Sequence, residues 1–264
     1  MKNMKKILGI IALAVIIGLS MAACSNDSGG GGGNAALGYT LNLTGQVYTE
    51  HWDDDNFRLN YTEFTGSIPS FNTGIGGTGG ITNGQLNFTI GTPTSFEYPT
   101  DDQWWDENAT VNPASAKGAM LWLEANYGYF LKRNHTISGN ENRGSETIVV
   151  LAYVYVDRDA TISAPRWNDS GTEYGYSWSE TFNAYTLNLK EGWNVINFKE
   201  AYSWTENSDT ETITVSAGEP GGLRWFYNDW DIIGYSMGIT PNASKSSRIY
   251  TTRMFYAIKN LTRH

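Results

Sequence analysis

Hydrophobic and polar residues alternate along much of the chain after residue 38, and this two-residue period is typical of half-buried β-strands. Residues 39–44 and 86–90 carry an apolar side chain at every second position. The second segment follows Asn83-Gly84, a pair that favours a tight hairpin turn. Residues 148–156 are almost entirely apolar, which predicts a central strand that is buried on both faces.

Further strands follow from the same pattern. Residues 185–189 alternate up to Lys190-Glu191-Gly192, and residues 193–198 are again apolar, so the two segments are predicted to form a hairpin. Residues 211–215 and 249–258 are also predicted strands. Residues 119–123 fit either a strand or a short helix that begins at Pro113, and a strand is favoured. Three polar stretches are predicted to be long connections, over residues 99–118, 132–146 and 164–181.

The amino-acid composition agrees with a β-rich domain. The chain contains 29 Gly, 16 Tyr, 10 Trp and 10 Phe residues, while only 17% of its residues are charged. Aromatic residues and glycine-containing turns favour sheets over helices. Residues 39–264 are therefore predicted to form an all-β, antiparallel β-sandwich of two packed sheets. That length is ample for one core, and two small subdomains remain possible.

The N-terminal segment has the features of a cleaved export signal. Lys2, Lys5 and Lys6 precede an apolar run that ends near residue 19, which is shorter than a membrane-spanning helix. The run leads to Ala22-Ala23-Cys24, and Cys24 is the only cysteine in the chain. An ordinary signal peptide with a stray cysteine, or a short membrane anchor, is the alternative interpretation.

This segment resembles the lipobox of bacterial lipoproteins, with Met21 at a position where leucine is usual. The resemblance implies a signal peptide over residues 1–23, which is cleaved before Cys24, and a lipid on the Cys24 thiol. It also implies a location at the outer membrane, the cell surface or the periplasm, because Ser25 rather than aspartate follows the cysteine. Residues 24–38 contain five consecutive glycines and are predicted to be a flexible tether.

Other segments resemble two further groups. Residues 43–48 and 81–90 look like the opening of a transthyretin-like or carboxypeptidase-regulatory-like sandwich. Residues 132–136, 152–162 and 187–194 are similar to small lipoproteins of spirochaete type. That group carries no activity to transfer, so this resemblance implies a location and a fold only.

The charge of the chain excludes one class of partner. Without the three lysines of the signal segment, 15 basic residues stand against 27 acidic ones. Such a surface repels nucleic acid and anionic lipid headgroups. Membrane attachment is therefore expected through the lipid on Cys24 alone, and no nucleic-acid partner is predicted.

Two sequence motifs match enzyme signatures without their required context. Gly234-Tyr235-Ser236-Met237-Gly238 has the pattern of a hydrolase nucleophile elbow, but no acidic residue follows it to complete a triad. Residues 74–79 have the glycine spacing of a dinucleotide-binding loop, but a turn and a strand follow instead of a helix. A flexible loop is the favoured interpretation there. No catalytic residue and no cofactor are predicted.

Metal ligands are also sparse in the sequence. The three histidines, His51, His135 and His264, lie far apart, and with Cys24 lipidated no thiol remains. Two acidic stretches, at residues 53–56 and 101–106, offer oxygen ligands for Ca²⁺ but lack the spacing of an EF-hand. No metal site is therefore predicted, and a calcium-binding acidic loop stays open.

Aromatic residues in polar stretches are the best indication of a binding site. Trp104 and Trp105 lie together in an acidic stretch, and neighbours on a strand point to opposite faces, so at least one is expected to be exposed. Two further groups occur at residues 167–178 and 225–230. Such side chains stack on sugar rings or contact proteins, although core packing is the favoured explanation for any one tryptophan.

The sequence thus predicts a membrane-anchored lipoprotein with a non-enzymatic β-sandwich for binding or surface structure, and Trp104 and Trp105 are its candidate ligand-binding residues. The alternatives are a secreted glycan-processing hydrolase and a carbohydrate-binding module. A hydrolase would need two carboxylates about 5–9 Å apart.

Overall fold

The structure is a computed structural model that describes residues 36–53, 58–96, 109–125, 128–140 and 142–229. Within these ranges the chain forms strands and no helix, which confirms the predicted all-β class. The strands are β1 (Leu41–Asp53), β2 (Arg58–Glu63), β3 (Thr78–Thr82), β4 (Gln85–Ile90), β5 (Thr110–Asn112), β6 (Gly118–Met120), β7 (Leu123–Ala125), β8 (Gly128–Asn140), β9 (Arg143–Val156), β10 (Ala160–Ala164), β11 (Trp167–Glu173), β12 (Tyr176–Phe182), β13 (Tyr185–Leu189), β14 (Gly192–Thr205), β15 (Ser208–Ala217) and β16 (Arg224–Asp229).

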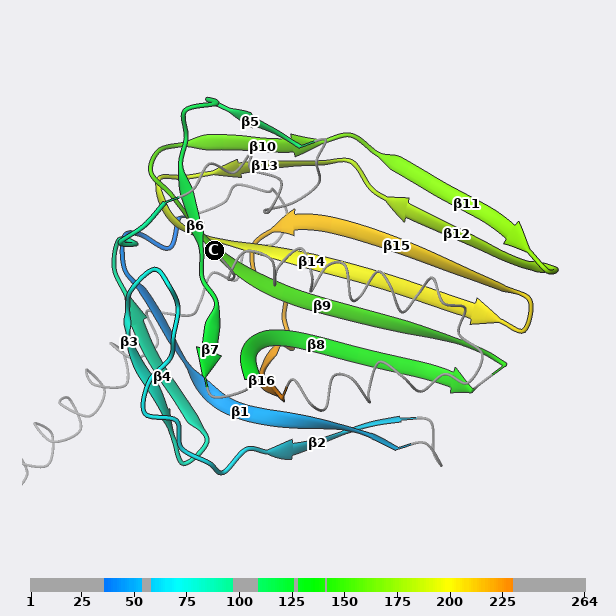
Figure 1. Ribbon diagram of the computed structural model, residues 1–264, viewed down its shortest axis with the longest axis horizontal. Helices are drawn as coiled ribbons and strands as arrows, with labels where there is room; N and C mark the ends of the chain where they lie inside the picture. Colours follow the sequence, from blue (N-terminus) through cyan, green and yellow to red (C-terminus); the bar gives the residue numbers. More distant parts are fainter. Residues whose placement is uncertain (1–35, 54–57, 97–108, 126–127, 141, 230–264) are drawn as a thin grey trace, which may run out of the picture. The chain divides into compact units, whose positions relative to one another are not determined.

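The strands form one large sheet and one small sheet (Figure 1). The large sheet has the order β11-β12-β15-β14-β9-β8-β16-β1-β4-β3, and β2, β6 and β7 pair with β1, β9 and β8. The small sheet has the order β13-β10-β5. Most neighbours are antiparallel, as predicted, but β1 is parallel to β16 and β12 is parallel to β15, so the large sheet is mixed.

The centre of the large sheet is covered on both faces. On one face, Ala152, Val154 and Val156 of β9 pack against the small sheet. On the other face, Leu151, Tyr153 and Tyr155 pack with residues from β1, β3 and β4. Alternate residues of β9 therefore belong to two separate hydrophobic cores, which explains why the run is apolar without interruption. The prediction that residues 148–156 form a central strand is confirmed.

The hairpin at Asn83-Gly84 is confirmed. β3 and β4 pair across this two-residue turn, in which Asn83 has a φ of 48° and Gly84 a φ of 78°. Both angles are positive, as a type I′ turn requires. Leu86, Phe88 and Ile90 are buried, while Gln85 and Asn87 are exposed, so the alternation in the sequence correctly predicts which side chains are buried.

The predicted hairpin over residues 185–198 is wrong. β13 pairs with β10 in the small sheet, whereas β14 pairs with β9 and β15 in the large sheet. The chain changes sheets at Lys190-Glu191-Gly192, where Gly192 has a φ of 101°. Both strands are buried on the sides that face each other, because they lie in the two layers of the sandwich and not side by side in one sheet.

Two predicted polar connections are also strands. Residues 132–146 contain the paired ends of β8 and β9, and residues 164–181 contain the β11–β12 hairpin. These strands extend beyond the covered centre of the sheet, so both of their faces carry polar side chains and the usual alternation of apolar and polar residues is lost. Residues 119–123 contain β6 and the first residue of β7, as favoured over a helix.

Candidate functional site

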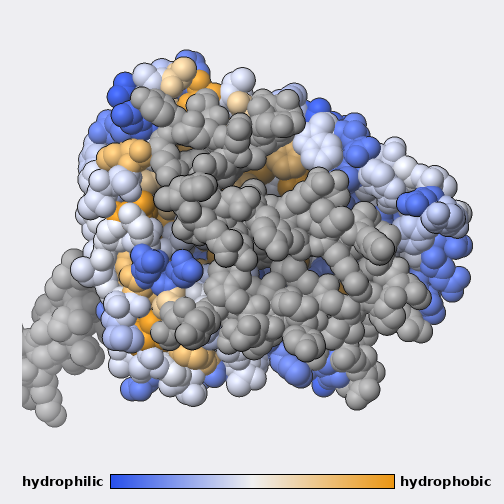
Figure 2. Space-filling model, viewed as in Figure 1, coloured by the Kyte–Doolittle hydropathy of each residue, from blue (hydrophilic) through white to orange (hydrophobic). Residues whose placement is uncertain are grey.

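Six strands of the large sheet, β11-β12-β15-β14-β9-β8, carry two chemically different faces where they extend beyond the core. Figure 2 shows hydrophilic residues gathered at this end, at the right of the view. Residues that are directly opposite on paired strands share a face, so the pairing assigns each side chain to one face or the other.

The first face, called the acidic face here, contains most of the charged and aromatic side chains. One row across the strands is Asp169, Glu180, Glu211, Tyr202 and Glu146. The adjacent rows add Trp178, Asp209 and Trp204 on one side, and Trp167, Phe182, Ile213, Glu200 and His135 on the other.

The second face, called the hydroxyl face here, carries serine and threonine at nearly every position. Between the row that contains Glu180 and the row that contains Asp209, the opposite face carries Ser170, Ser179, Thr210, Ser203, Ser145 and Ser138. Several of these hydroxyls bond across the strands, as Ser203 and Thr210 do at 2.6 Å and Ser138 and Ser145 at 3.0 Å. This face is exposed and its hydroxyls bond to one another, so the acidic face is the stronger candidate for a site.

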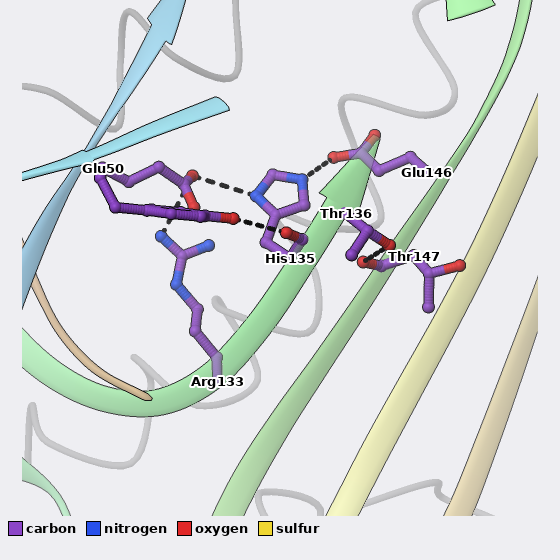
Figure 3. A network of polar contacts seen from close by, with 7 residues as sticks. Glu50, Arg133, His135, Thr136, Glu146 and Thr147 are labelled. Atoms are coloured by element: carbon purple, nitrogen blue, oxygen red, sulfur yellow. Dashed lines mark hydrogen bonds and ion pairs between the residues drawn. The ribbon is translucent and has the colours of Figure 1, made fainter. Parts of the chain in front are cut away.

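A buried charge network forms one end of the acidic face, as Figure 3 shows. His135 of β8 lies between two carboxylates, with its Nδ1 3.0 Å from Glu50 Oε1 and its Nε2 2.5 Å from Glu146 Oε1. Arg133 Nη2 lies 3.3 Å from the same Glu50 oxygen. The Tyr61 hydroxyl donates a hydrogen bond to the His135 carbonyl at 2.6 Å. The network thus connects β1, β2, β8 and β9.

The two carboxylates keep His135 protonated. Burial disfavours the charged imidazole, but the hydrogen bonds to Glu146 and Glu50 and their negative charges outweigh it and raise the His135 pKa to about 9. Burial also opposes ionisation of Glu50, yet the bonds from His135 and the positive charge of Arg133 lower the Glu50 pKa. At neutral pH the network therefore holds a buried imidazolium between two carboxylates.

The row of carboxylates contains a second perturbed group. Glu211 is 8% exposed, and its Oε1 has no hydrogen-bond partner. Burial, followed by the nearby charges of Glu200, Glu180 and Asp209, raises the Glu211 pKa to about 8. Glu211 therefore retains its proton at neutral pH, although it stands among ionisable acids.

Tyrosines hold the carboxylate beside this row. Asp209 is buried, and its Oδ2 accepts hydrogen bonds from the Tyr202 hydroxyl at 3.0 Å and the Tyr176 hydroxyl at 3.1 Å. Burial and the negative charge of Asp209 raise the Tyr176 pKa to about 12, so the tyrosine remains a hydrogen-bond donor at neutral pH. Asp209 is thereby fixed in position on the acidic face.

Glycines allow the indoles of the acidic face to lie flat. A Cβ atom added to Gly171 would meet three ring atoms of Trp178 at 2.7, 2.8 and 2.8 Å, so the ring lies face-on above the glycine. Gly144 has the same relation to the Trp204 ring. Trp204 is buried and stacks on Tyr202 at a centroid distance of 5.7 Å, whereas Trp178 is only half-buried. Trp178 can therefore present its outer ring face to a ligand.

Several predicted residues lie outside the described ranges. These are the candidate ligand-binding Trp104 and Trp105, the lipid-attachment Cys24, the elbow residue Ser236 and the histidine His264. The acidic stretch 101–106, most of the stretch 53–56 and the predicted strand over residues 249–258 also lie outside them.

Other predicted candidates belong to the core. Trp225 is 4% exposed, stacks on Tyr153 and donates from Nε1 to the Thr44 carbonyl at 3.2 Å. The glycine-rich loop over residues 74–79 leads directly into β3, so it lacks the helix that a dinucleotide site needs. Among the described residues, no group of three histidine, cysteine or acidic side chains is placed to hold a metal ion.

The sequence did not lead us to predict a group formed by His135, Glu146, Glu180 and Glu211. A signal was present in residues 177–181 and 208–212, where serine or threonine alternates with tryptophan or an acidic residue. Such alternation of two polar types indicates a strand with two different polar faces. The clustering of the four side chains depends on strand order, which this alternation does not provide.

Comparison with known proteins gives no relative. No protein-family model matches the chain, and neither a curated protein nor a solved structure is detectably similar to it. Within the described residues, no helix is long and apolar enough to cross a membrane.

Proposed function

We propose that the chain is a membrane-anchored bacterial lipoprotein whose β-sandwich domain binds carbohydrate through the acidic face. The lipobox-like segment that ends at Cys24 supports the anchor, and the anchor places the domain at the outer membrane, the cell surface or the periplasm. The arrangement of the described residues supports the ligand class.

The half-buried Trp178 is the observation that carries this proposal. Its ring lies flat over Gly171, and Asp169, two residues before that glycine on the same face, is exposed. A sugar ring has an apolar face that stacks on an indole and hydroxyls at its rim that bond to carboxylates. A half-buried flat indole with an exposed carboxylate beside it meets both requirements.

The chemistry of the acidic face also selects among ligands. Its six strands contribute several carboxylates, whereas the basic groups Arg133 and His135 are already bonded to acids. An anionic ligand would therefore be repelled, and an uncharged glycan is favoured. Trp104 and Trp105 remain candidates for additional contacts.

Affinity electrophoresis of the purified protein tests this proposal. Gels would contain hydroxyethylcellulose, arabinoxylan, laminarin, galactomannan or starch, all of which are uncharged polysaccharides. We expect retardation in at least one gel, and Trp178→Ala should weaken binding by tenfold for each 1.4 kcal/mol of lost stacking. Trp104→Ala and Trp105→Ala measure the contribution of the other pair.

Tyr39→Ala is the matched control, because Tyr39 is 55% exposed and lies away from the acidic face, bonded to Glu191. Its mobility should equal that of the wild type in every gel. Normal migration of the wild type in all five polysaccharides would refute carbohydrate binding. Equal losses in Trp178→Ala and Tyr39→Ala would show that the acidic face is not the binding surface.

A further inference from the structure

The centre of the acidic face is covered, whereas the hydroxyl face of the same strands is open. Glu180, Asp209 and Glu211 are 3%, 6% and 8% exposed. Thr210 lies between Asp209 and Glu211 in β15, points to the opposite face and is exposed. Carboxyl groups on a bare sheet would remain in contact with water in the same way. Other residues of the chain therefore lie over the acidic face.

The described strands do not supply this cover. Figure 1 shows β11, β12, β15, β14, β9 and β8 extending past the small sheet. The small sheet meets the margin of the acidic face at Tyr185, whose ring contacts Phe182 at a centroid distance of 5.8 Å. Among the strands that the structure describes, no other lies over the rows of Glu180 and Asp209. The cover must come from residues outside the described ranges.

Three stretches outside these ranges are long enough to cover several strands, namely residues 1–35, 97–108 and 230–264. Residues 1–23 are the proposed signal peptide, and residues 24–35 contain five glycines and no basic side chain. Residues 97–108 contain five acidic residues and no basic one, so the acidic face would repel them. Residues 230–264, called the C-terminal segment here, remain.

The C-terminal segment is basic in a chain that is acidic overall. The chain has 27 acidic and 18 basic residues, but this segment has a single acidic residue, Asp231. Its five basic residues all fall within residues 245–264, and they are Lys245, Arg248, Arg253, Lys259 and Arg263. Ile249, Phe255, Ile258 and Leu261 lie between these charges, so the segment can also exclude water from the face that it contacts.

The acidic face has the complementary charge and lies within reach. Its rows carry six acidic side chains, and His135 is the only basic one among these described residues. Buried carboxylates are stable when a cation pairs with them. β16 ends at Asp229, and five strand spacings, about 24 Å, separate β16 from β12. An extended chain spans about 3.3–3.6 Å per residue, so the 35 residues of the segment reach every strand of the face.

We infer that the C-terminal segment lies across the centre of the acidic face and places its basic side chains against the carboxylates there. The outer end of the face stays open, since Trp178 is half-buried and Asp169 is exposed. The segment would then border the proposed glycan site without filling it. Carbohydrate binding is not assumed, and the proposed signal cleavage is used only to exclude residues 1–23.

Carboxyl labelling of the purified protein tests this contact. A water-soluble carbodiimide couples glycine ethyl ester to accessible carboxyl groups, and mass spectrometry of peptides gives the rate at each residue. In the wild type, Glu180 and Asp209 should label far more slowly than Glu206, which is exposed in the turn between β14 and β15. Replacing all five basic residues of the segment with glutamine should raise the labelling of Glu180 and Asp209 to the level of Glu206.

Two control variants separate the charge of the segment from other effects. Replacing its three arginines with lysine preserves the charge and should preserve the protection. Lys199→Gln removes a charge from the hydroxyl face, where Lys199 is exposed, and should also leave the protection unchanged. Unchanged protection in the five-glutamine variant would overturn the inferred pairing.

A second measurement on the wild type decides the question even if the five-glutamine variant does not fold. Without the added amine, carbodiimide joins a lysine directly to a carboxylate that it contacts. We expect cross-links from Lys245 or Lys259 to Glu200, which is half-buried, or to the exposed Asp169. Cross-links of both lysines to residues 97–108 alone, or wild-type labelling of Glu180 as fast as that of Glu206, would overturn the inference. Cross-links found only between two molecules, in a mixture of isotope-labelled and unlabelled protein, would also overturn it.

Discussion

The imidazolium of His135 predicts a stability that depends on pH in a defined direction. In the folded protein its pKa is about 9, against an ordinary histidine value of 6.5. At 1.36 kcal/mol per unit, the difference corresponds to about 3 kcal/mol. Because the folded-state pKa is the higher one, this stability is fully present below pH 6.5 and is lost as the pH rises through 9.

His135→Gln is the perturbation that isolates this contribution. Glutamine cannot carry the charge, so Glu50 and Glu146 would lose their shared cation, and removal of one partner from a buried ion network costs about 3–5 kcal/mol. Urea unfolding, followed by tryptophan fluorescence at several pH values from 6 to 10, gives the free energy of unfolding of both proteins. We expect a difference of several kcal/mol at pH 6 that shrinks by about 3 kcal/mol at pH 10.

The comparison between the two proteins also removes the effect of Glu211. Its pKa is raised from 4.5 to about 8, so its contribution is lost as the pH rises from about 4.5 to 8, but Glu211 is present in both proteins and its effect cancels in the difference. A difference that is equal at pH 6 and pH 10 would refute a charged His135. An NMR titration of the His135 ring with a midpoint near 6.5 would lead to the same conclusion.

Three further predictions concern other parts of the chain. Cys24→Ala should abolish incorporation of a fatty-acid probe and partition into detergent, and persistent label would contradict lipidation. Gly84→Ala should lower the free energy of unfolding by more than about 1 kcal/mol, because Gly84 has a φ of 78° and an added Cβ would overlap the Phe64 carbonyl. Gly91 has open space around it, so Gly91→Ala should leave the free energy of unfolding almost unchanged in the same urea titration. Wild-type protein should not react with a fluorophosphonate at Ser236, and labelling that Ser236→Ala abolishes would show the opposite.

Local patterns in the sequence predicted the elements better than their partners. Asn83-Gly84 fixed a hairpin because two residues with positive φ determine the turn by themselves. The segments around Lys190-Glu191-Gly192 had the same appearance, yet they belong to different sheets. Two buried strands joined by a short turn look alike whether they pair within a sheet or pack across a sandwich, and only long-range contacts decide between these arrangements.

The candidate site could not be located from the sequence for a related reason. Glu146, Glu180 and Glu211 come from β9, β12 and β15, and in the sheet β15 lies between the other two, with β14 separating it from β9, so their order differs from that in the chain. The parallel pairing of β12 with β15 brings Glu180 opposite Glu211, although 31 positions separate their numbers in the sequence. The low charge of the hydroxyl face and the concentration of acids on the opposite face likewise follow from register.

The attachment of the N-terminal segment has a mechanical consequence. The Leu37 amide donates to the Trp193 carbonyl at 2.8 Å, and the Trp193 amide donates to the Gly38 carbonyl at 2.8 Å. Trp193 is fully buried, and its indole is held by the Gly91 carbonyl at 2.9 Å. Directly after this clamp the chain enters β1, which lies between β16 and β4 within the large sheet. With the proposed anchor at Cys24, a pull on the N-terminal segment would load an interior strand at once, so the fold would resist that force as a unit and would not unfold from a frayed end.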